Sequence, residues 1–221
     1  MTTVAQPRIQ IAVDVDNIAR ARSVVQAALA AGADWIEIGK PLIEFEGIRA
    51  AAELCRSFPG AYVLMDLMIM AAPRKYIEAA AQAGVRNVTV TALAPWETVK
   101  AAIDVGHEAG VEVTVDMFNV ADPVDCARRA EAAGADYVMV HFGVDQKRND
   151  PSGSPIATLR RVAETVRTPV SYATYDIAES LAACAAGAAV IVQGEPLISA
   201  ANVEAAVRAF IDETKDRNPN G

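Results

Sequence analysis

The stretch AAGADYVMVH (residues 132–141) decides the fold, because it joins the end of a helix to a buried strand. Alanine-rich sequence of helical character leads up to Gly134, and glycine commonly ends a helix in the left-handed conformation. The residues that follow are almost all apolar or aromatic, which is typical of a strand buried on both faces. The stretch therefore predicts a helix end, a tight turn and a strand over 136–141.

The same unit recurs along the chain. Glycines at positions 32, 60, 84, 110 and 187 also close alanine-rich stretches and precede β-rich runs, at spacings of about 25 residues or, for the last, two periods. The strands are expected at 9–14, 34–39, 61–66, 86–92, 111–116, 136–141, 168–173 and 188–194. Eight strand-plus-helix units predict an α/β fold of a single domain, a (β/α)₈ or TIM barrel. An open doubly wound sheet is the alternative, but VDVDNIA (13–19) lacks the glycine-rich phosphate fingerprint.

Composition narrows the class of protein. The 221 residues are 52% hydrophobic and 22% charged, and no apolar run is long enough to cross a membrane. MTTVAQPRIQIAVDVD (1–16) does not read as a signal peptide, so we expect a cytoplasmic protein with a polar leader over 1–7 and a frayed tail over about 213–221. A net charge of −8 argues against nucleic acid and anionic membranes as partners. Cys55, Cys126 and Cys184 are expected to be buried free thiols.

Acidic residues lie where the expected strands end. Asp14, Glu37, Asp66 and Asp116 occupy such positions, together with His141, one of two histidines. The carboxyl ends of the strands form the mouth of a barrel, where catalytic groups gather, so these side chains should converge. For Asp14 and Asp116 a helix N-cap is an equally good interpretation. Glutamate between two isoleucines is costly to desolvate unless it is paired, hydrogen-bonded or bound to a metal, which favours a functional Glu37.

The chain also resembles a known family. AVDVDN (12–17), DWIEIGKPLIEFEGI (34–48), LMDLMI (64–69) and GADYVMVHFGVDQ (134–146) are similar to the 3-hexulose-6-phosphate synthase and 3-keto-L-gulonate-6-phosphate decarboxylase branch of the orotidine-5′-phosphate decarboxylase suprafamily, over about residues 8–210. The resemblance implies a metal-assisted carbon–carbon lyase or synthase of the aldolase type. It would act through an enediolate on a small ketose, sugar phosphate or keto-acid. Mg²⁺ or another divalent cation would bind Glu37 and Asp66, with Asp14 orienting substrate and His141 moving a proton.

The chain departs from the family at one motif. The family's third strand ends in Asp-x-Lys-x-x-Asp, and here Asp66 is kept while Met68 and Ala71 replace the lysine and the second aspartate. Losing an ammonium removes electrostatic stabilisation of developing negative charge. Lys40, three positions after Glu37, is a candidate substitute. The alternative is a surface lysine paired with Glu44 or Glu46.

The phosphate-binding loops of the family are altered too. We expect substrate contacts from Asp116, Tyr172, Thr174, Gln193 and Gly194. The Gly194 turn, followed by a helix start, could accept an anion. Against this, Glu195 would repel an anion, and Tyr172 and Tyr175 favour a flatter or uncharged group. The alternative is that backbone groups alone hold a phosphate.

Other functions stay open. An isomerase, an epimerase, a hydrolase or a non-catalytic ligand-binding relative would each fit the altered motif. If the protein is an enzyme, a small molecule is its expected substrate. Relatives in the family are dimers, so a homodimer is expected, with the apolar run Met65 to Ala72 as interface if it is exposed and as core if it is not.

Overall fold

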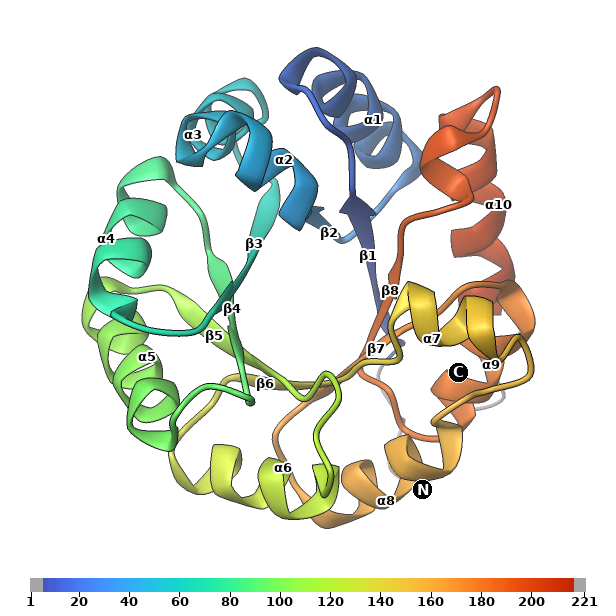
Figure 1. Ribbon diagram of the computed structural model, residues 1–221. Coiled ribbons are helices and arrows are strands. Elements are labelled where there is room, and N and C mark those ends of the chain that lie inside the picture. The colour runs from blue at the N-terminus through green and yellow to red at the C-terminus, as the bar shows by residue number, and fades with distance from the viewer. Residues whose placement is uncertain (1–5, 217–221) are drawn as a thin grey trace.

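The computed structural model describes residues 6–216 and has the closed barrel of eight parallel strands that the sequence predicts (Figure 1). The strands are β1 (Arg8–Val13), β2 (Trp35–Ile38), β3 (Tyr62–Ile69), β4 (Asn87–Thr91), β5 (Glu112–Asp116), β6 (Tyr137–Val140), β7 (Val170–Ala173) and β8 (Val190–Gln193). Each strand pairs with the next, and β8 pairs with β1 to close the ring. All eight expected strands are present, and the open-sheet alternative is excluded.

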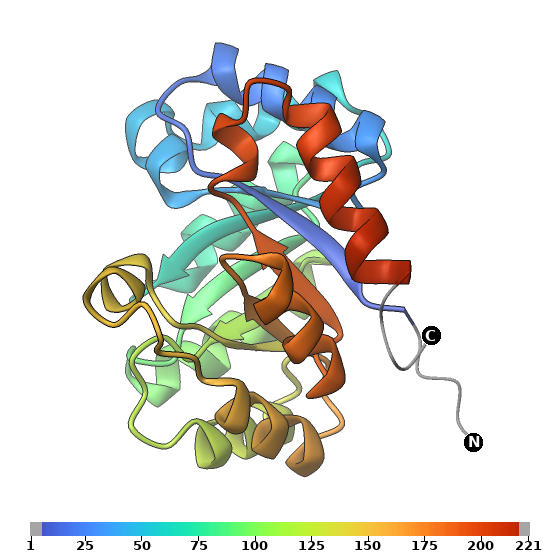
Figure 2. The ribbon, with the colours of Figure 1, turned by 90° about the vertical axis from the view of Figure 1, so that its right-hand side faces the viewer.

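Helices surround the barrel as an outer ring (Figures 1 and 2). They are α1 (Ile18–Ala31), α2 (Lys40–Glu46), α3 (Ile48–Ser57), α4 (Pro73–Ala83), α5 (Trp96–Ala109), α6 (Pro123–Ala132), α7 (Val144–Asn149), α8 (Ile156–Thr165), α9 (Ile177–Ala185) and α10 (Val203–Asp216), with a 3₁₀ helix η1 (Leu197–Ser199) before the last. The repeat glycines end helices as expected: Gly134, for example, has φ of +88°. The additional short helices α2 and α7 both begin at the barrel mouth.

Two boundaries differ from the sequence expectation. Strand β3 continues past Asp66 to Ile69, because a register shift between Met65 and Ile69 lets the chain keep pairing with β4. Helix α10 reaches Asp216, beyond the expected start of the tail, and Lys215 in its last turn lies 2.8 Å from the Asp34 carboxylate. Residues 1–5 of the expected leader and 217–221 of the tail lie outside the described residues.

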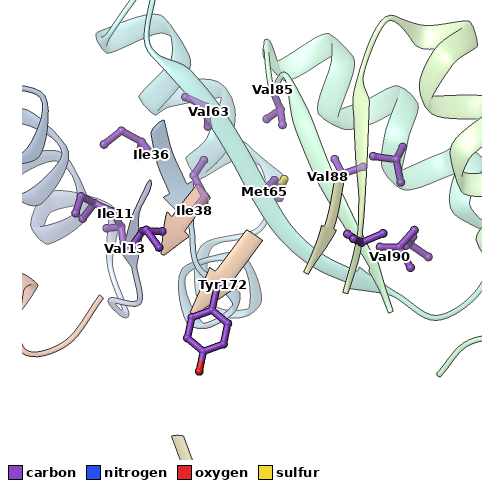
Figure 3. Close-up of a cluster of buried hydrophobic side chains, with 14 of the residues drawn as sticks. Ile11, Val13, Ile36, Ile38, Val63, Met65, Val85, Val88, Val90 and Tyr172 are labelled. Carbon is purple, nitrogen blue, oxygen red and sulfur yellow. The ribbon is translucent and has the colours of Figure 1, made fainter. Parts of the chain in front are cut away.

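The core has two layers, because successive strand residues point to opposite faces of the barrel wall. The outer layer packs the strands against the helices, and Figure 3 shows part of it, with Ile36, Met65, Val88 and Tyr172. Inside the barrel, the Trp35 ring stacks on Tyr62 with centroids 4.1 Å apart. These aromatic rings lie near the starts of their strands and fill one end of the barrel, so space is left only at the other end.

Two smaller expectations are also answered. Cys55, Cys126 and Cys184 form no disulfide; Cys184 is buried, and the other two are partly buried. In the part of the chain that the structure describes, no helix combines the length and apolar character needed to span a membrane.

Candidate active site

The candidate site lies inside the barrel, at the carboxyl ends of the strands. A deep cavity of about 20 Å³, room for one water molecule, is lined by Gln10, Glu37, Leu64, Asp66, Thr89, Thr114, Asp116, Met139, His141 and Ser171. A larger cavity of about 530 Å³ occupies the mouth and shares Glu37, Asp66, Met139 and His141 with the deep one. The strand-end acids and the histidine are therefore brought together, as predicted.

Glu37 and Asp66 come from neighbouring strands and face the same cavities. Burial raises the pKa of Glu37 well above its ordinary value, and the charge of Asp66 raises it further. The Gln10 side-chain amide donates a hydrogen bond to Glu37 and opposes that rise. Burial also raises the pKa of Asp66 to about 6, with a further contribution from Asp116. The two carboxyls thus form a site of concentrated negative charge.

Thr89 fixes the position of Asp66. Its hydroxyl donates to Oδ1 of Asp66 at 2.6 Å and accepts from the backbone N–H of Met68 at 2.7 Å. Met68 has φ of +42°, an uncommon value for a residue with a side chain. One threonine therefore holds both the strand irregularity and the carboxylate, while the Met68 side chain lines the mouth where the family has its lysine.

His141 is held by Asp116. Its Nδ1 donates to Oδ2 of Asp116 at 2.9 Å, and Oδ1 of the same carboxylate accepts from the Phe118 backbone N–H at 2.8 Å. Burial lowers the pKa of His141, but the charge of Asp116 and their hydrogen bond outweigh it and raise the pKa above its ordinary value. With Nδ1 engaged, Nε2 is left for a ligand. Asp116 therefore positions His141; it also lines the deep cavity, and its predicted contact with substrate stays a prediction.

Asp14 lies at the rim of the mouth beside Gly39. A Cβ at Gly39 would come 2.1 Å from Oδ1 of Asp14, so only glycine permits this approach. Desolvation raises the pKa of Asp14, the charge of His141 opposes the rise, and Glu195 adds to it. Asp14 is therefore electrostatically connected to the site, as the sequence predicted from its strand-end position.

Lys40 forms the surface ion pair with Glu44 that was the alternative to a role in the site. Its Nζ lies 3.1 Å from the Glu44 carboxylate, and 47% of its side chain is exposed. The residue also lines the mouth cavity. A surface ion pair of this kind is weak, so Lys40 as a substitute for the motif lysine stays a prediction.

Two predicted substrate residues lie away from the cavities. Tyr172 points outward into the layer between barrel and helices, where its hydroxyl donates to Glu179 at 2.9 Å (Figure 3). Gln193 is buried on the same outer side and accepts from the Thr174 hydroxyl at 2.9 Å. The expectation was wrong for both because the alternation of β7 and β8 turns these positions outward. Thr174 and Gly194 do line the mouth, as does Tyr175.

Other site residues were missed at the sequence level. Gln10 contacts Glu37, Thr89 holds Asp66, and Phe118 lies with its ring centroid 4.9 Å from that of His141. Polar residues two positions apart in otherwise apolar strands, such as Thr89 and Thr91, were the available signal. That alternation marks the side of the strand that faces the barrel interior.

Comparisons with known proteins agree with this site and fold. A family model described as Orotidine 5′-phosphate decarboxylase / HUMPS family matches residues 7–210. This chain belongs to that family. Among orotidine 5′-phosphate decarboxylase / HUMPS relatives, a 3-hexulose-6-phosphate synthase from Bacillus subtilis (strain 168) is 33% identical over 164 residues, which are 74% of this chain and 78% of the relative. The chain thus lies in the branch that the sequence resemblance predicts.

Two further members of the orotidine 5′-phosphate decarboxylase / HUMPS family support the same placement. A bifunctional enzyme Fae/Hps from Methanothrix thermoacetophila is 27% identical over 209 residues, 95% of this chain but only 53% of that relative. The crystal structure of a 3-hexulose-6-phosphate synthase from Salmonella typhimurium has a TM-score of 0.87 and 27% identity, covering 94% of this chain and 98% of that one. The named synthases are lyase-type enzymes, and this chain is classed with them.

The carboxylates fit the divalent cation that the family resemblance implies. In residues 6–216 no group of three or more His, Cys, Asp or Glu side chains is arranged so that all of them could hold one metal ion. Mg²⁺ does not need one, since it is commonly bound by one or two carboxylates together with water and substrate oxygens. Glu37 and Asp66 supply such a pair. Burial raises the pKa of Glu37 first and the negative charges of Asp66 and Asp14 raise it further, and a cation would oppose both effects.

Proposed function

We propose that this chain is a metal-assisted carbon–carbon lyase or synthase of the aldolase type that works through an enediolate of a small ketose. The observation that carries the proposal is the convergence of Glu37, Asp66 and an oriented His141 on one cavity. Family membership gives the reaction class, and the cavity residues give the chemistry. Mg²⁺ or another divalent cation is the proposed cofactor, held by Glu37 and Asp66.

The geometry supports a proposed role for each residue. In the cleavage direction, a hydroxyl loses its proton, the carbon–carbon bond breaks, and the electron pair moves to the ketone oxygen. Glu37 and Asp66 would hold a divalent cation, and its positive charge would stabilise the enediolate. His141 Nε2 is placed to transfer the proton, because Asp116 fixes the imidazole through Nδ1. Asp14 at the rim is placed to orient a substrate hydroxyl.

Met68 limits the catalytic power that we expect. A thioether cannot stabilise an enediolate as the family's lysine would, and removing such a charge is worth on the order of 2–4 kcal/mol. The proposed reaction therefore depends more on the cation than in relatives that keep the lysine.

A thermal-shift experiment tests the metal site. Mg²⁺ at about a hundred times its Kd should raise the Tm of the protein by about 5 °C or more. Glu37→Gln should abolish the shift, whereas Glu164→Gln, at the exposed end of α8, should keep it. A wild-type protein indifferent to Mg²⁺, Mn²⁺ and Co²⁺ would refute the metal assignment and favour a non-catalytic binding protein.

Deuterium exchange tests the enediolate. Incubated in D₂O with a panel of ketoses, phosphorylated and not, the enzyme should incorporate deuterium at the carbon next to the carbonyl of its substrate. Asp66→Asn and His141→Asn should each slow this exchange by about 100-fold or more. Retention of full exchange in both variants would contradict the proposed roles.

We further propose that the protein is a cytoplasmic homodimer. Exposed apolar side chains on α2, after β3 and on α4 support an interface: Phe45 is 73% exposed, Met70 56% and Tyr76 50%. Met65, at the start of the expected apolar interface run, is buried core instead. Light scattering at micromolar concentration should give twice the chain mass, and Met70→Glu should lower it. A monomer would contradict the assembly.

A further inference from the structure

The mouth of the candidate site is short of positive charge. Its charged lining includes five acids and one lysine, Asp14, Glu37, Asp66, Asp145, Glu195 and Lys40. The Lys40 ammonium already pairs with Glu44. A cation bound by two of the acids would still leave Asp14, Asp145 and Glu195. Asp145 pairs with the exposed Arg148 at 3.3 Å, and the charge of His141 acts on Asp14. The field at the mouth therefore disfavours a dianionic ligand.

The loops after β7 and β8, where barrels of this kind often bind phosphate, carry acids here. The start of α9 is capped by Asp176, whose carboxylate accepts from the Glu179 backbone N–H at 2.8 Å. A carboxylate thus takes the place at the helix N-terminus that a phosphate would need. The nearby Lys147 is directed to the Gly153 carbonyl at 3.1 Å and lies 3.7 Å from the Glu179 carboxylate.

Glu195 is the acid that follows β8. It lines the mouth next to Gly194, its carboxylate accepts a hydrogen bond from Ser199, and its charge acts on Asp14. A phosphate placed against Gly194 would meet this carboxylate. Repulsion between like charges in a partly desolvated cleft is worth more than at an open surface.

The deep cavity is rich in hydrogen-bond acceptors, among them the carboxylates of Glu37, Asp66 and Asp116. Oε1 of Gln10 is buried and has no partner, although the residue is only 2% exposed. The Thr89 hydroxyl donates a hydrogen bond to Asp66, and the Thr114 hydroxyl donates one to Asn87. An unpaired buried acceptor is costly. A ligand with hydroxyl groups would satisfy Gln10 and the carboxylates, whereas a phosphate ester adds further acceptors.

We propose that this site takes an unphosphorylated, hydroxyl-rich ketose, and that Glu195 excludes phosphate esters from it. The inference rests on the proposed function and names its substrate class. The amide of Gln10 and the rim carboxylate of Asp14 receive the hydroxyls of the sugar. The apolar wall of Met68 and Val144 then faces a part of the ligand that carries no charge.

Binding with a matched pair of probes tests the proposal. The full chain with saturating Mg²⁺ is titrated with D-ribulose, with D-ribulose 5-phosphate and with inorganic phosphate. Binding is measured by the NMR signal of His141 and by isothermal titration calorimetry. D-Ribulose 5-phosphate should bind no tighter than D-ribulose, and inorganic phosphate should leave His141 unshifted. Glu195→Arg should bind D-ribulose 5-phosphate at least tenfold more tightly than the wild type does. The milder Glu195→Gln should bind it about threefold more tightly. Glu164→Arg, at the opposite end of the barrel, should change the affinity for D-ribulose 5-phosphate less than twofold.

Two results would overturn the proposal: a wild-type preference of tenfold or more for the phosphate ester, or no gain in folded Glu195→Arg and Glu195→Gln. If neither sugar binds the wild type measurably, a gain of phosphate-ester binding in Glu195→Arg still supports it. Affinity is measured here without turnover. Failure of the lyase chemistry would therefore appear in the deuterium exchange and leave this ranking of ligands unchanged.

Discussion

At the scale of single residues, Asp116 controls His141. The carboxylate is 1% exposed and uses one oxygen to hold the Phe118 N–H and the other to hold the imidazole. Its charge is what raises the pKa of His141 against the effect of burial. The proton-transfer group is therefore tuned by a neighbour that does not itself need to touch the substrate.

Asp116→Asn should lower the pKa of His141 by about one unit or more, because it removes the opposing charge while burial remains. NMR titration of the imidazole signals measures this. The chain has only two histidines, so the second signal, from His107, is an internal control. His107 contacts Asp136 on the outside of the protein. An unchanged His141 pKa would contradict the assigned pair.

Met68→Lys should restore the ammonium that relatives carry beside Asp66. A cation facing the two carboxylates favours their ionised forms, so the pKa values of Glu37 and Asp66 should fall and the metal-free protein should become more stable at pH 7, by about 1 kcal/mol. Urea unfolding measures the stability, with Met68→Gln as a neutral control of similar length. If Met68→Lys is no more stable than Met68→Gln, the side chain does not face the acids.

At the scale of elements, β3 carries the site because it is irregular. The register shift lies between Met65 and Ile69, Asp66 and Met68 within it line the mouth, and Thr89 of β4 supports both. A longer strand than the sequence indicated is thus combined with an uncommon backbone conformation at Met68, which a cross-strand hydrogen bond from Thr89 supports.

Thr89→Val should destabilise the protein by about 1–3 kcal/mol, because the partly buried N–H of Met68 loses its acceptor although the shape is kept. The Mg²⁺-dependent rise in Tm should also shrink, since Asp66 is no longer held. Thr158→Val on α8, away from the barrel interior, is the matched control and should change neither quantity. Equal effects of the two variants would rule out a special role for Thr89.

At the scale of the whole molecule, the buried acids make stability depend on pH. Folding raises the pKa of Glu37, and that of Asp66 to about 6, so the folded state binds more protons than the unfolded state between about pH 4 and pH 7. The raised pKa of His141 acts in the same direction, because its stabilisation is present at low pH and lost as the imidazole deprotonates. The free energy of unfolding should therefore fall as pH rises through this window.

In metal-free protein the fall should be on the order of 2 kcal/mol between pH 4 and pH 7. Urea unfolding at a series of pH values measures it. Glu37→Gln should flatten the curve and be more stable than the wild type at pH 7, whereas Glu164→Gln should follow the wild type. Parallel curves for Glu37→Gln and the wild type would show that Glu37 is not strained by burial.

Much of the site could be predicted, because its side chains lie where the strands end along the sequence. The positions of Glu37, Asp66 and His141 needed only the repeat and the rule that parallel strands end on one side. Tyr172 and Gln193 were misplaced, since their inward or outward direction depends on the register of β7 and β8 in the closed ring. Thr89 and Gln10 were missed, because their partners lie 23 and 27 residues away along the chain.

The sequence by itself determined the eightfold strand-plus-helix repeat, the barrel and the chemical types of the groups at its mouth. These depend on local composition and on periodicity, which each segment carries without its neighbours. Only the tertiary structure decided which carboxylates share a cavity, which oxygen of Asp116 holds His141, and that Tyr172 belongs to the outer layer instead of the cavities. Those properties arise from distances across the closed ring, and distances of that kind exist only once the chain has folded.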